Sequence, residues 1–208
     1  MDLIIDIGAN VGKTVSKFIE VSNKVVCFEP NPTLSSHLEN IFSGKNVVVD
    51  NRGVSNKNGT QTFNISNAHT ISTFSEDWIK NSRFTNDYNW DKTVEVETIT
   101  LDSIIELYGV PDYIKIDIEG YEYEVLTSFN TLLPNTLIAF EWAEEQKDKI
   151  KSTLEHLNKL GYNLFGYTES DEILFEEQIK WFVFENFKFT DELISERKEK
   201  WGMIYFKK

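Results

Sequence analysis

The sequence predicts a single α/β domain built around a mostly parallel β-sheet. Three observations favour this class. Short apolar runs alternate with segments of helical periodicity from residue 3 onward. The first run leads directly into a glycine turn, "DIGANVG" over residues 6–12, where a buried strand would pass into a helix. A chain of 208 residues that is 40% hydrophobic and 13% aromatic is long enough for one sizeable core.

The first quarter of the chain alternates strands with helices. Residues 3–8 ("LIIDIG") and 24–29 ("KVVCFE") are short apolar runs, which is typical of strands buried on both faces. Residues 11–22 carry apolar side chains at helical spacing, and residues 31–42 open with Asn-Pro, a good helix start. With a third strand over 46–51, this order implies parallel strands joined by right-handed crossovers.

The middle of the chain is less regular. Residues 52–67 predict a turn at "NKNGT" followed by a short strand. Residues 68–92 are polar and have no clean period, so we expect a loop with about one helical turn. Residues 93–101 alternate like a half-exposed strand, and residues 101–109 predict a short helix that ends at a glycine.

The rest of the chain again alternates apolar strands with helices. Residues 112–120 and 135–142 predict two further core strands, with a helix over 121–129 between them. Residues 145–160 predict an amphipathic helix, and Gly161 suits the position just after its end. The tail supplies three more candidate strands, at residues 162–167, 180–186 and 203–206.

Charge and composition restrict the partners. The net charge of −13 argues against a nucleic-acid surface and against an anionic membrane, because both need clustered Lys and Arg. We therefore expect no nucleic acid and no membrane among the partners, and a neutral or cationic ligand fits better. No apolar run approaches the length of a transmembrane helix, and Asp2 and Asp6 stand where a signal peptide would be basic and apolar.

The single cysteine indicates a reducing compartment. Cys27 lies inside an apolar strand, cannot form an internal disulfide, and is expected to be a small core residue. A cytoplasmic location follows as an expectation. The amino-acid composition, rich in Asn, Lys and Ile, hints at an AT-rich genome such as that of a large virus. In that case the compartment is the host cytoplasm.

The glycine turn admits two readings. A phosphate-binding loop needs four residues between its glycines, whereas Gly8 and Gly12 bracket three, although Gly-Lys-Thr follows as such a loop requires. The dinucleotide fingerprint also fails, because Asn10 stands at its second glycine. Asp6 would repel a pyrophosphate but suits a ligand that carries an ammonium and a sulfonium. Glu29, at the end of the second strand, is placed to accept from ribose hydroxyls.

An ordered set of motifs resembles the FkbM family of S-adenosylmethionine-dependent methyltransferases. The motifs cover residues 3–142 and are "DIGANVG", "FEPNP", "NRGVSNKNGT", "TLDSI", "YIKIDIEGYEYEVL" and "IAFEW". The resemblance implies a Rossmann-like class I methyltransferase fold, in which a mostly parallel seven-stranded sheet ends in an antiparallel strand and carries helices on both faces. It also implies methylation of a hydroxyl on a sugar, a glycan or a small hydroxylated metabolite, with S-adenosylmethionine as cofactor.

The resemblance also divides residues 1–208 into parts of one methyltransferase domain. Residues 1–120 form the cofactor half, and residues 66–92 and 143–200 shape the acceptor site. Because a strand-like run starts at residue 3, the chain is either a minimal protein or a module of a longer polypeptide, for instance one fused to or working with glycosyltransferases. An NAD- or ATP-dependent enzyme on a similar sheet and a degenerate binding module remain the alternatives.

The resemblance assigns the cofactor site residue by residue. The glycines let the backbone pass close to the amino-acid end of the ligand, Asp6 and Asn10 contact that end, Glu29 takes the ribose, and the segment after the third strand holds the adenine. The predicted cofactor residues are Asp6, Gly8, Ala9, Asn10, Gly12, Glu29, Pro30, Asn31, Arg52, Gly53, Val54 and Asp117.

Carboxylates dominate the predicted acceptor side. Asp117 and Glu119 are two residues apart on a strand and share a face, Lys115 lies further back on it, and Glu141 ends the next strand. In an α/β sheet these strand ends line the ligand crevice. Either a carboxylate with a raised pKa deprotonates the acceptor, or Asp117, Glu119 and Glu141 hold a divalent cation that acidifies a diol.

Two reservations accompany that prediction. The sequence has no clear Asp-Asp-Asn metal pattern, which favours chemistry without a metal. Glu119 has the alternative role of a cap for the helix that starts near Tyr121. A histidine is a further candidate: His69, in the loop after the third strand, is predicted to contact the acceptor or to act as a base.

Overall fold

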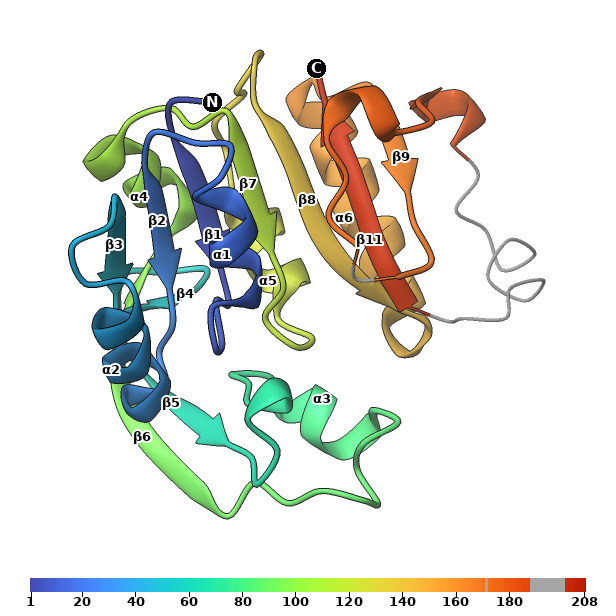
Figure 1. The fold of residues 1–208 in the computed structure, drawn as a ribbon. Helices are drawn as coiled ribbons and strands as arrows, with labels where there is room; N and C mark the ends of the chain where they lie inside the picture. The colour runs from blue at the N-terminus through green and yellow to red at the C-terminus, as the bar shows by residue number, and fades with distance from the viewer. Residues whose placement is uncertain (171, 188–200) are drawn as a thin grey trace.

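The computed structural model describes residues 1–170, 172–187 and 201–208, and one eight-stranded sheet organises them (Figure 1). Its strand order is β10-β9-β11-β8-β7-β1-β2-β3. The strands are β1 (Ile4–Ile7), β2 (Val25–Phe28), β3 (Val47–Asp50), β7 (Tyr113–Ile116), β8 (Leu137–Ala143), β9 (Leu164–Tyr167), β10 (Phe182–Val183) and β11 (Trp201–Lys207).

The predicted fold class is confirmed. β3, β2, β1, β7 and β8 pair in parallel, and the last strand, β11, runs antiparallel to both of its neighbours, β8 and β9. The sheet has eight strands where seven were expected, because the two-residue strand β10 pairs with the outer edge of β9. Residues 180–186 were expected to supply a longer strand, but only Phe182–Val183 pair, and a 3₁₀ turn follows at Phe184–Asn186.

Helices cover both faces of the sheet. Helices α1 (Lys13–Phe18) and α2 (Pro32–Ile41) lie on one face, and helices α4 (Leu101–Tyr108), α5 (Glu122–Ser128) and α6 (Lys147–Leu160) lie on the other (Figure 1). The alternation of side chains along each strand supplies both cores. Ile4 packs with Val15 and Phe18 of α1, whereas its neighbour Ile5 belongs to the cluster that α4, α5 and α6 complete.

A second, three-stranded sheet lies beyond the carboxyl ends of the central strands (Figure 1). Its order is β4-β6-β5, from β4 (Gly53–Val54), β6 (Lys92–Ile99) and β5 (Gly59–Ile65). Within residues 68–92, where a loop with about one helical turn was expected, the structure has a 3₁₀ turn at His69–Ile71 and helix α3 (Glu76–Asn81). Ser75 caps α3 by accepting from the Trp78 N–H, and the indole of Trp78 is buried.

The single cysteine lies where the sequence placed it, in the core. Cys27 is a buried free thiol on β2, as expected for a core residue. None of the helices within residues 1–170, 172–187 and 201–208 has the length and apolar character that crossing a bilayer requires. Part of the predicted acceptor-shaping segment 143–200, namely residues 171 and 188–200, lies outside the described residues.

The glycine turn after β1 fixes the position of the site. Gly8 has a φ of 82°, in the left-handed region that favours glycine. A Cβ at this position would lie 1.8 Å from the main-chain oxygen of Asp117, because the turn passes directly against the end of β7. Gly12 serves packing instead, since a Cβ there would meet the side chains of Leu38 and Phe42 at 2.8 and 2.7 Å.

Replacing Gly8 by alanine should therefore destabilise the fold strongly. Gly44→Ala is the matched control, because Gly44 also has a positive φ, 76°, but no atom lies within 4 Å of its added Cβ. We expect a loss of about 1 kcal/mol for Gly44→Ala and more than about 3 kcal/mol for Gly8→Ala, measured by denaturant unfolding. Equal losses would contradict the close approach of the two backbones.

Candidate active site

A cavity of about 250 Å³ opens at the carboxyl ends of β1, β2, β7 and β8. This is where parallel α/β sheets bind their ligands. We call it the inner cavity. Nine residues that the sequence singled out line it: Gly8, Asn10, Glu29, Pro30, Val54, His69, Asp117, Glu119 and Glu141. The fold thus brings together residues that lie up to 133 positions apart in the chain.

Other residues of the inner cavity were not predicted. Phe28, Phe63 and Phe74 form an apolar wall, Thr70 and Ser72 follow His69, and Trp201 arrives from the start of β11. Phe63 lies at an inward position of the alternating strand β5, which is a signal that the sequence carried. Trp201 gave no such signal, because its place depends on β11 pairing with β8.

Glu29 supports the glycine turn while it faces the cavity. Its Oε2 accepts the N–H of Asn10 at 2.8 Å, and its Oε1 accepts the N–H of Asn31 at 2.9 Å. Burial raises the pKa of Glu29 to about 7, and the two N–H donors oppose that rise. One carboxylate therefore ties the turn after β1 to the start of α2, and each of its oxygens keeps a lone pair for a ligand.

A buried ion-pair cluster underlies the turn. The Nζ of Lys115 lies 3.3 Å from Asp6 Oδ1 and 3.2 Å from Asp117 Oδ2, and it donates to the carbonyl of Gly8 at 3.1 Å. Burial alone would lower the pKa of Lys115, but Asp117 and Asp6 raise it above its ordinary value, so the ammonium stays charged. Lys115 and Asp6 themselves lie beneath the inner cavity and do not line it.

Five other predicted cofactor residues stand outside the lining of the inner cavity: Ala9, Gly12, Asn31, Arg52 and Gly53. Asn31 caps α2 by accepting the Thr33 N–H. Arg52 pairs with Asp50, its Nε donating at 2.9 Å, and it lines a separate groove beside Asn58 and Ser103.

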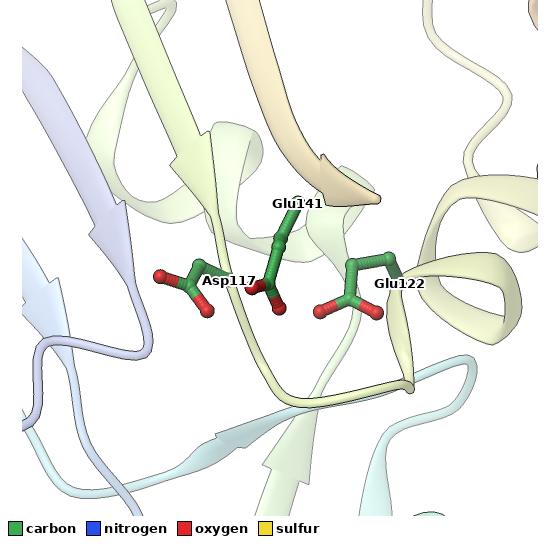
Figure 2. Close-up of side chains that lie close together, drawn as sticks. All are labelled: Asp117, Glu122 and Glu141. Atoms are coloured by element: carbon green, nitrogen blue, oxygen red, sulfur yellow. The ribbon is translucent and has the colours of Figure 1, made fainter. Parts of the chain in front are cut away.

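Three carboxylates gather beside one another at the wall of the inner cavity (Figure 2). Asp117, Glu122 and Glu141 each offer an oxygen, and these atoms lie within 4.8 Å of one another. The sequence prediction named Glu119 in place of Glu122. The backbone of Glu119 has a φ of 57°, and its carbonyl accepts from Thr73 Oγ1 at 2.8 Å, so the chain folds back sharply and brings Glu122 to the group. Glu122 was missed because this turn is not visible in the sequence pattern.

Burial raises the pKa of the carboxyl groups at this wall of the cavity. The pKa of Glu119 and that of Glu141 lie well above the ordinary value for glutamate, and that of Glu122 is raised to about 7. Glu122 also accepts the Ile118 N–H at 2.7 Å, which opposes the rise. Carboxyl groups this close share protons or require a cation, so the cluster is able to accept a proton near neutral pH or to bind a divalent ion.

His69 joins two sides of the inner cavity. Its Nδ1 lies 2.7 Å from Asn10 Oδ1, and Asn10 Nδ2 donates to the His69 carbonyl at 3.4 Å. The glycine turn is thereby linked to the 3₁₀ turn at His69–Ile71. Asn10 has a positive φ of 52°, which places its side chain in reach of that turn.

A second cavity of about 350 Å³ adjoins the first. We call it the outer cavity. The two share four lining residues: Thr70, Glu119, Glu141 and Trp201. Ile71, Arg83, Phe84 and Tyr88 complete the lining of the outer cavity. Two compartments that meet at carboxyl groups suit a reaction between two ligands.

Comparison with known proteins agrees with this arrangement. The model of the FkbM methyltransferase domain matches residues 6–164. The chain belongs to this family. Its sequence is 28% identical over 141 residues to the hexuronic acid methyltransferase AglP of Haloferax volcanii, covering 64% of this chain and 52% of that protein. The chain thus spans about half the length of this curated relative.

Solved structures share the fold. An FkbM methyltransferase from Methylobacillus flagellatus is 15% identical, with a TM-score of 0.52 over 99% of this chain and 43% of the other. A precorrin-6y C5,15-methyltransferase from Geobacter metallireducens is 11% identical, with a TM-score of 0.50 over 99% of this chain and 79% of the other. The FkbM domain is therefore a methyltransferase domain on a Rossmann-like sheet, and its family implies S-adenosylmethionine as cofactor.

The inner cavity fits that cofactor. Gly8 leaves the backbone bare at the floor, and Glu29 offers carboxylate lone pairs at the end of β2. Val54, Phe63 and Phe74 supply an apolar wall suited to an aromatic base. Phosphate-binding cations are absent from this lining, within the described part of the chain, which suits a ligand without phosphates.

The raised pKa of Glu122 predicts a pH-dependent stability. The folded state holds this proton more tightly than the unfolded state, in which the pKa is about 4.5. The stabilising contribution is thus fully present below pH 4.5 and is lost as the pH rises through 7. Glu122→Gln keeps an oxygen for the Ile118 N–H and should flatten this loss, by on the order of 1–3 kcal/mol at pH 8.

Unfolding free energies at pH 5 and pH 8 check this expectation. The matched control is Glu155→Gln, an exposed site on α6. The control should follow the pH profile of the unmodified chain, and identical profiles for all three proteins would refute the shift.

Proposed function

We propose that this FkbM domain transfers the methyl group of S-adenosylmethionine to a hydroxyl oxygen of a sugar, a glycan or a similar small hydroxylated molecule. One observation carries the proposal: the inner and outer cavities share Glu119 and Glu141, so carboxyl groups stand where donor and acceptor would meet. The relative AglP, by its name, methylates a hexuronic acid, which supports a sugar as the acceptor.

The inner cavity is the proposed donor site. When bound, S-adenosylmethionine supplies a methyl group that its sulfonium has already activated, so the main task of the protein is alignment. Glu29 accepts from the ribose hydroxyls, Asn10 and Gly8 border the amino-acid end, and the Phe63–Phe74 wall packs against the adenine. Lys115 and Asp6 act from beneath, by holding Asp117 and the Gly8 carbonyl in place.

Glu141 is the proposed general base. It lines both cavities, and its raised pKa lets its carboxylate take the proton of an acceptor hydroxyl more readily than an ordinary glutamate would. Asp117 and Glu122 then share the proton with it. Glu119 and His69 are the other candidate bases, and a divalent ion on the carboxylates is the alternative to a base.

The partner enzymes and the cellular compartment belong to the same proposal. Sugar acceptors are built by glycosyltransferases, so such enzymes are the partners we expect, within one polypeptide or as separate proteins. The cytoplasmic location inferred from the lone Cys27 stays a prediction.

The donor assignment is tested at Glu29. Glu29→Ala removes the ribose acceptor and the brace of the glycine turn, and should weaken binding of S-adenosylhomocysteine at least tenfold by calorimetry, or about 1.4 kcal/mol. Glu39→Ala, at an exposed site on α2, should leave binding unchanged. NAD and ATP are titrated in parallel. A protein that binds NAD or ATP but does not bind S-adenosylhomocysteine would overturn the donor assignment.

The base assignment is tested at Glu141. Glu141→Gln should lower turnover about 10²–10⁴-fold, the usual share of a general base, while binding of S-adenosylhomocysteine changes less than twofold. Turnover is followed as methylated product by mass spectrometry on a panel of glycans. Parallel variants Glu119→Gln and His69→Ala show whether the base lies elsewhere, and loss of activity with EDTA that Mg²⁺ restores would favour the metal alternative.

A further inference from the structure

Three aromatic side chains line the outer cavity and remain partly open to it. Its aromatic residues come from two distant parts of the chain, Phe84 and Tyr88 after α3 and Trp201 at the start of β11. Tyr88 is 38% exposed, and Phe84 and Trp201 are partly exposed, whereas the aromatic residues of the core clusters are buried. Aromatic surface left open beside a reaction centre is typical of a wall that a ligand covers.

Arg83 stands between these rings in a fixed position. Its guanidinium carbon lies 4.9 Å from the ring centre of Phe84 and 5.9 Å from that of Trp201. Its Nη1 reaches the carboxylate of Glu145 at 3.3 Å, and its main-chain N–H donates to the same carboxylate at 3.0 Å. With the ring of Trp78 at 5.8 Å as well, the side chain is held by three aromatic contacts and one ion pair, without being buried.

The fixed guanidinium keeps donors to spare. Among the described residues, neither Nε nor Nη2 of Arg83 meets a hydrogen-bond acceptor, and Arg83 is the one Lys or Arg in the lining of the two joined cavities. A guanidinium is a rigid fork of donors that recognises oxygen atoms in a defined direction. The carboxyl groups of Glu119 and Glu141 line the same cavity.

We propose that the outer cavity is a subsite for one pyranose ring of the acceptor, with the ring packed on Trp201, Phe84 and Tyr88 and one oxygen substituent bound by Arg83. Its lining combines aromatic rings, guanidinium donors and carboxyl acceptors, which matches a molecule that has C–H faces and oxygen-bearing edges. Another oxygen substituent of the ring then faces Glu141, the proposed base. This subsite rests on the proposed sugar methylation for its ligand class.

A guanidinium can bind either of two pyranose substituents: a neutral hydroxyl or a carboxylate. The experiment therefore titrates two probes, methyl α-glucopyranoside and methyl α-glucuronide, into the protein saturated with S-adenosylhomocysteine, and measures binding by saturation-transfer NMR. Four variants are compared: Trp201→Ala, Tyr88→Ala, Arg83→Met and, as control, Trp181→Ala. Trp181 packs with the cluster on the α1–α2 face and lines neither cavity. Arg83→Met keeps a long unbranched side chain and removes the donors.

The subsite predicts that Trp201→Ala, Tyr88→Ala and Arg83→Met each raise the dissociation constant of at least one probe tenfold or more. S-adenosylhomocysteine binding should change less than twofold in all of them, and Trp181→Ala should bind the probes as the unmodified chain does. A greater loss for the glucuronide than for the glucoside in Arg83→Met identifies a carboxylate on Arg83, and equal losses identify a hydroxyl.

Three results would overturn the subsite. One is unchanged probe binding in both Tyr88→Ala and Arg83→Met, which tests it even if Trp201→Ala does not fold. Another is a loss of probe binding in Trp181→Ala equal to that in the other variants. The third is an unmodified protein that binds S-adenosylhomocysteine but neither probe. Failure of the broader proposal looks different, because S-adenosylhomocysteine itself would then not bind.

Discussion

The buried ammonium of Lys115 is the interaction on which the site depends. Asp6 and Lys115 are register partners on the adjacent parallel strands β1 and β7, so their side chains meet on the same face of the sheet. An unpaired charge at 4% exposure would cost several kcal/mol, but two carboxylates and the Gly8 carbonyl offset that cost here. The end of β7 and the glycine turn after β1 are thereby held at a fixed distance.

The carboxyl groups around this ion pair divide into two kinds. Asp117, next to the ammonium, has a counter-charge, whereas burial raises the pKa of Glu119, Glu122 and Glu141, and the nearby charge of Asp117 adds to each rise. A strongly acidic chain thus holds, at one spot, carboxyl groups that bind a proton more tightly than an exposed glutamate does. The difference in environment, and not the residue type, separates the pKa of these groups from that of an ordinary carboxylate.

Much of the fold could be predicted because it rests on local patterns. The apolar runs of β1, β2 and β7 and the glycine turn are contiguous in the sequence, and parallel topology follows from their alternation with helices. The position of α3 within residues 68–92 was not predicted, because its six residues are stabilised by the Ser75 cap and by burial of Trp78, which is a tertiary contact. The strand expected over 180–186 was predicted too long, because only Phe182 and Val183 pair with β9.

The candidate site, like the fold, could be predicted where its residues follow directly from the predicted strands. Residues at the ends of predicted strands, such as Glu29 and Glu141, were found because parallel strands end at one edge of the sheet. Glu122 and Arg83 were not, because each is brought to the site by a turn whose geometry is set by distant neighbours, Thr73 for the one and Glu145 for the other.

The insertion of β11 between β8 and β9 also sets the order in which the site is assembled. Apart from Trp201, every lining residue of the inner cavity lies between Ile7 and Glu141. Trp201 belongs to both cavities and reaches them only when β11 has paired with β8, across a separation of 58 residues from Ala143. During synthesis the other lining residues of the inner cavity therefore precede Trp201, and the wall that the inner and outer cavities share needs this long-range contact to be complete.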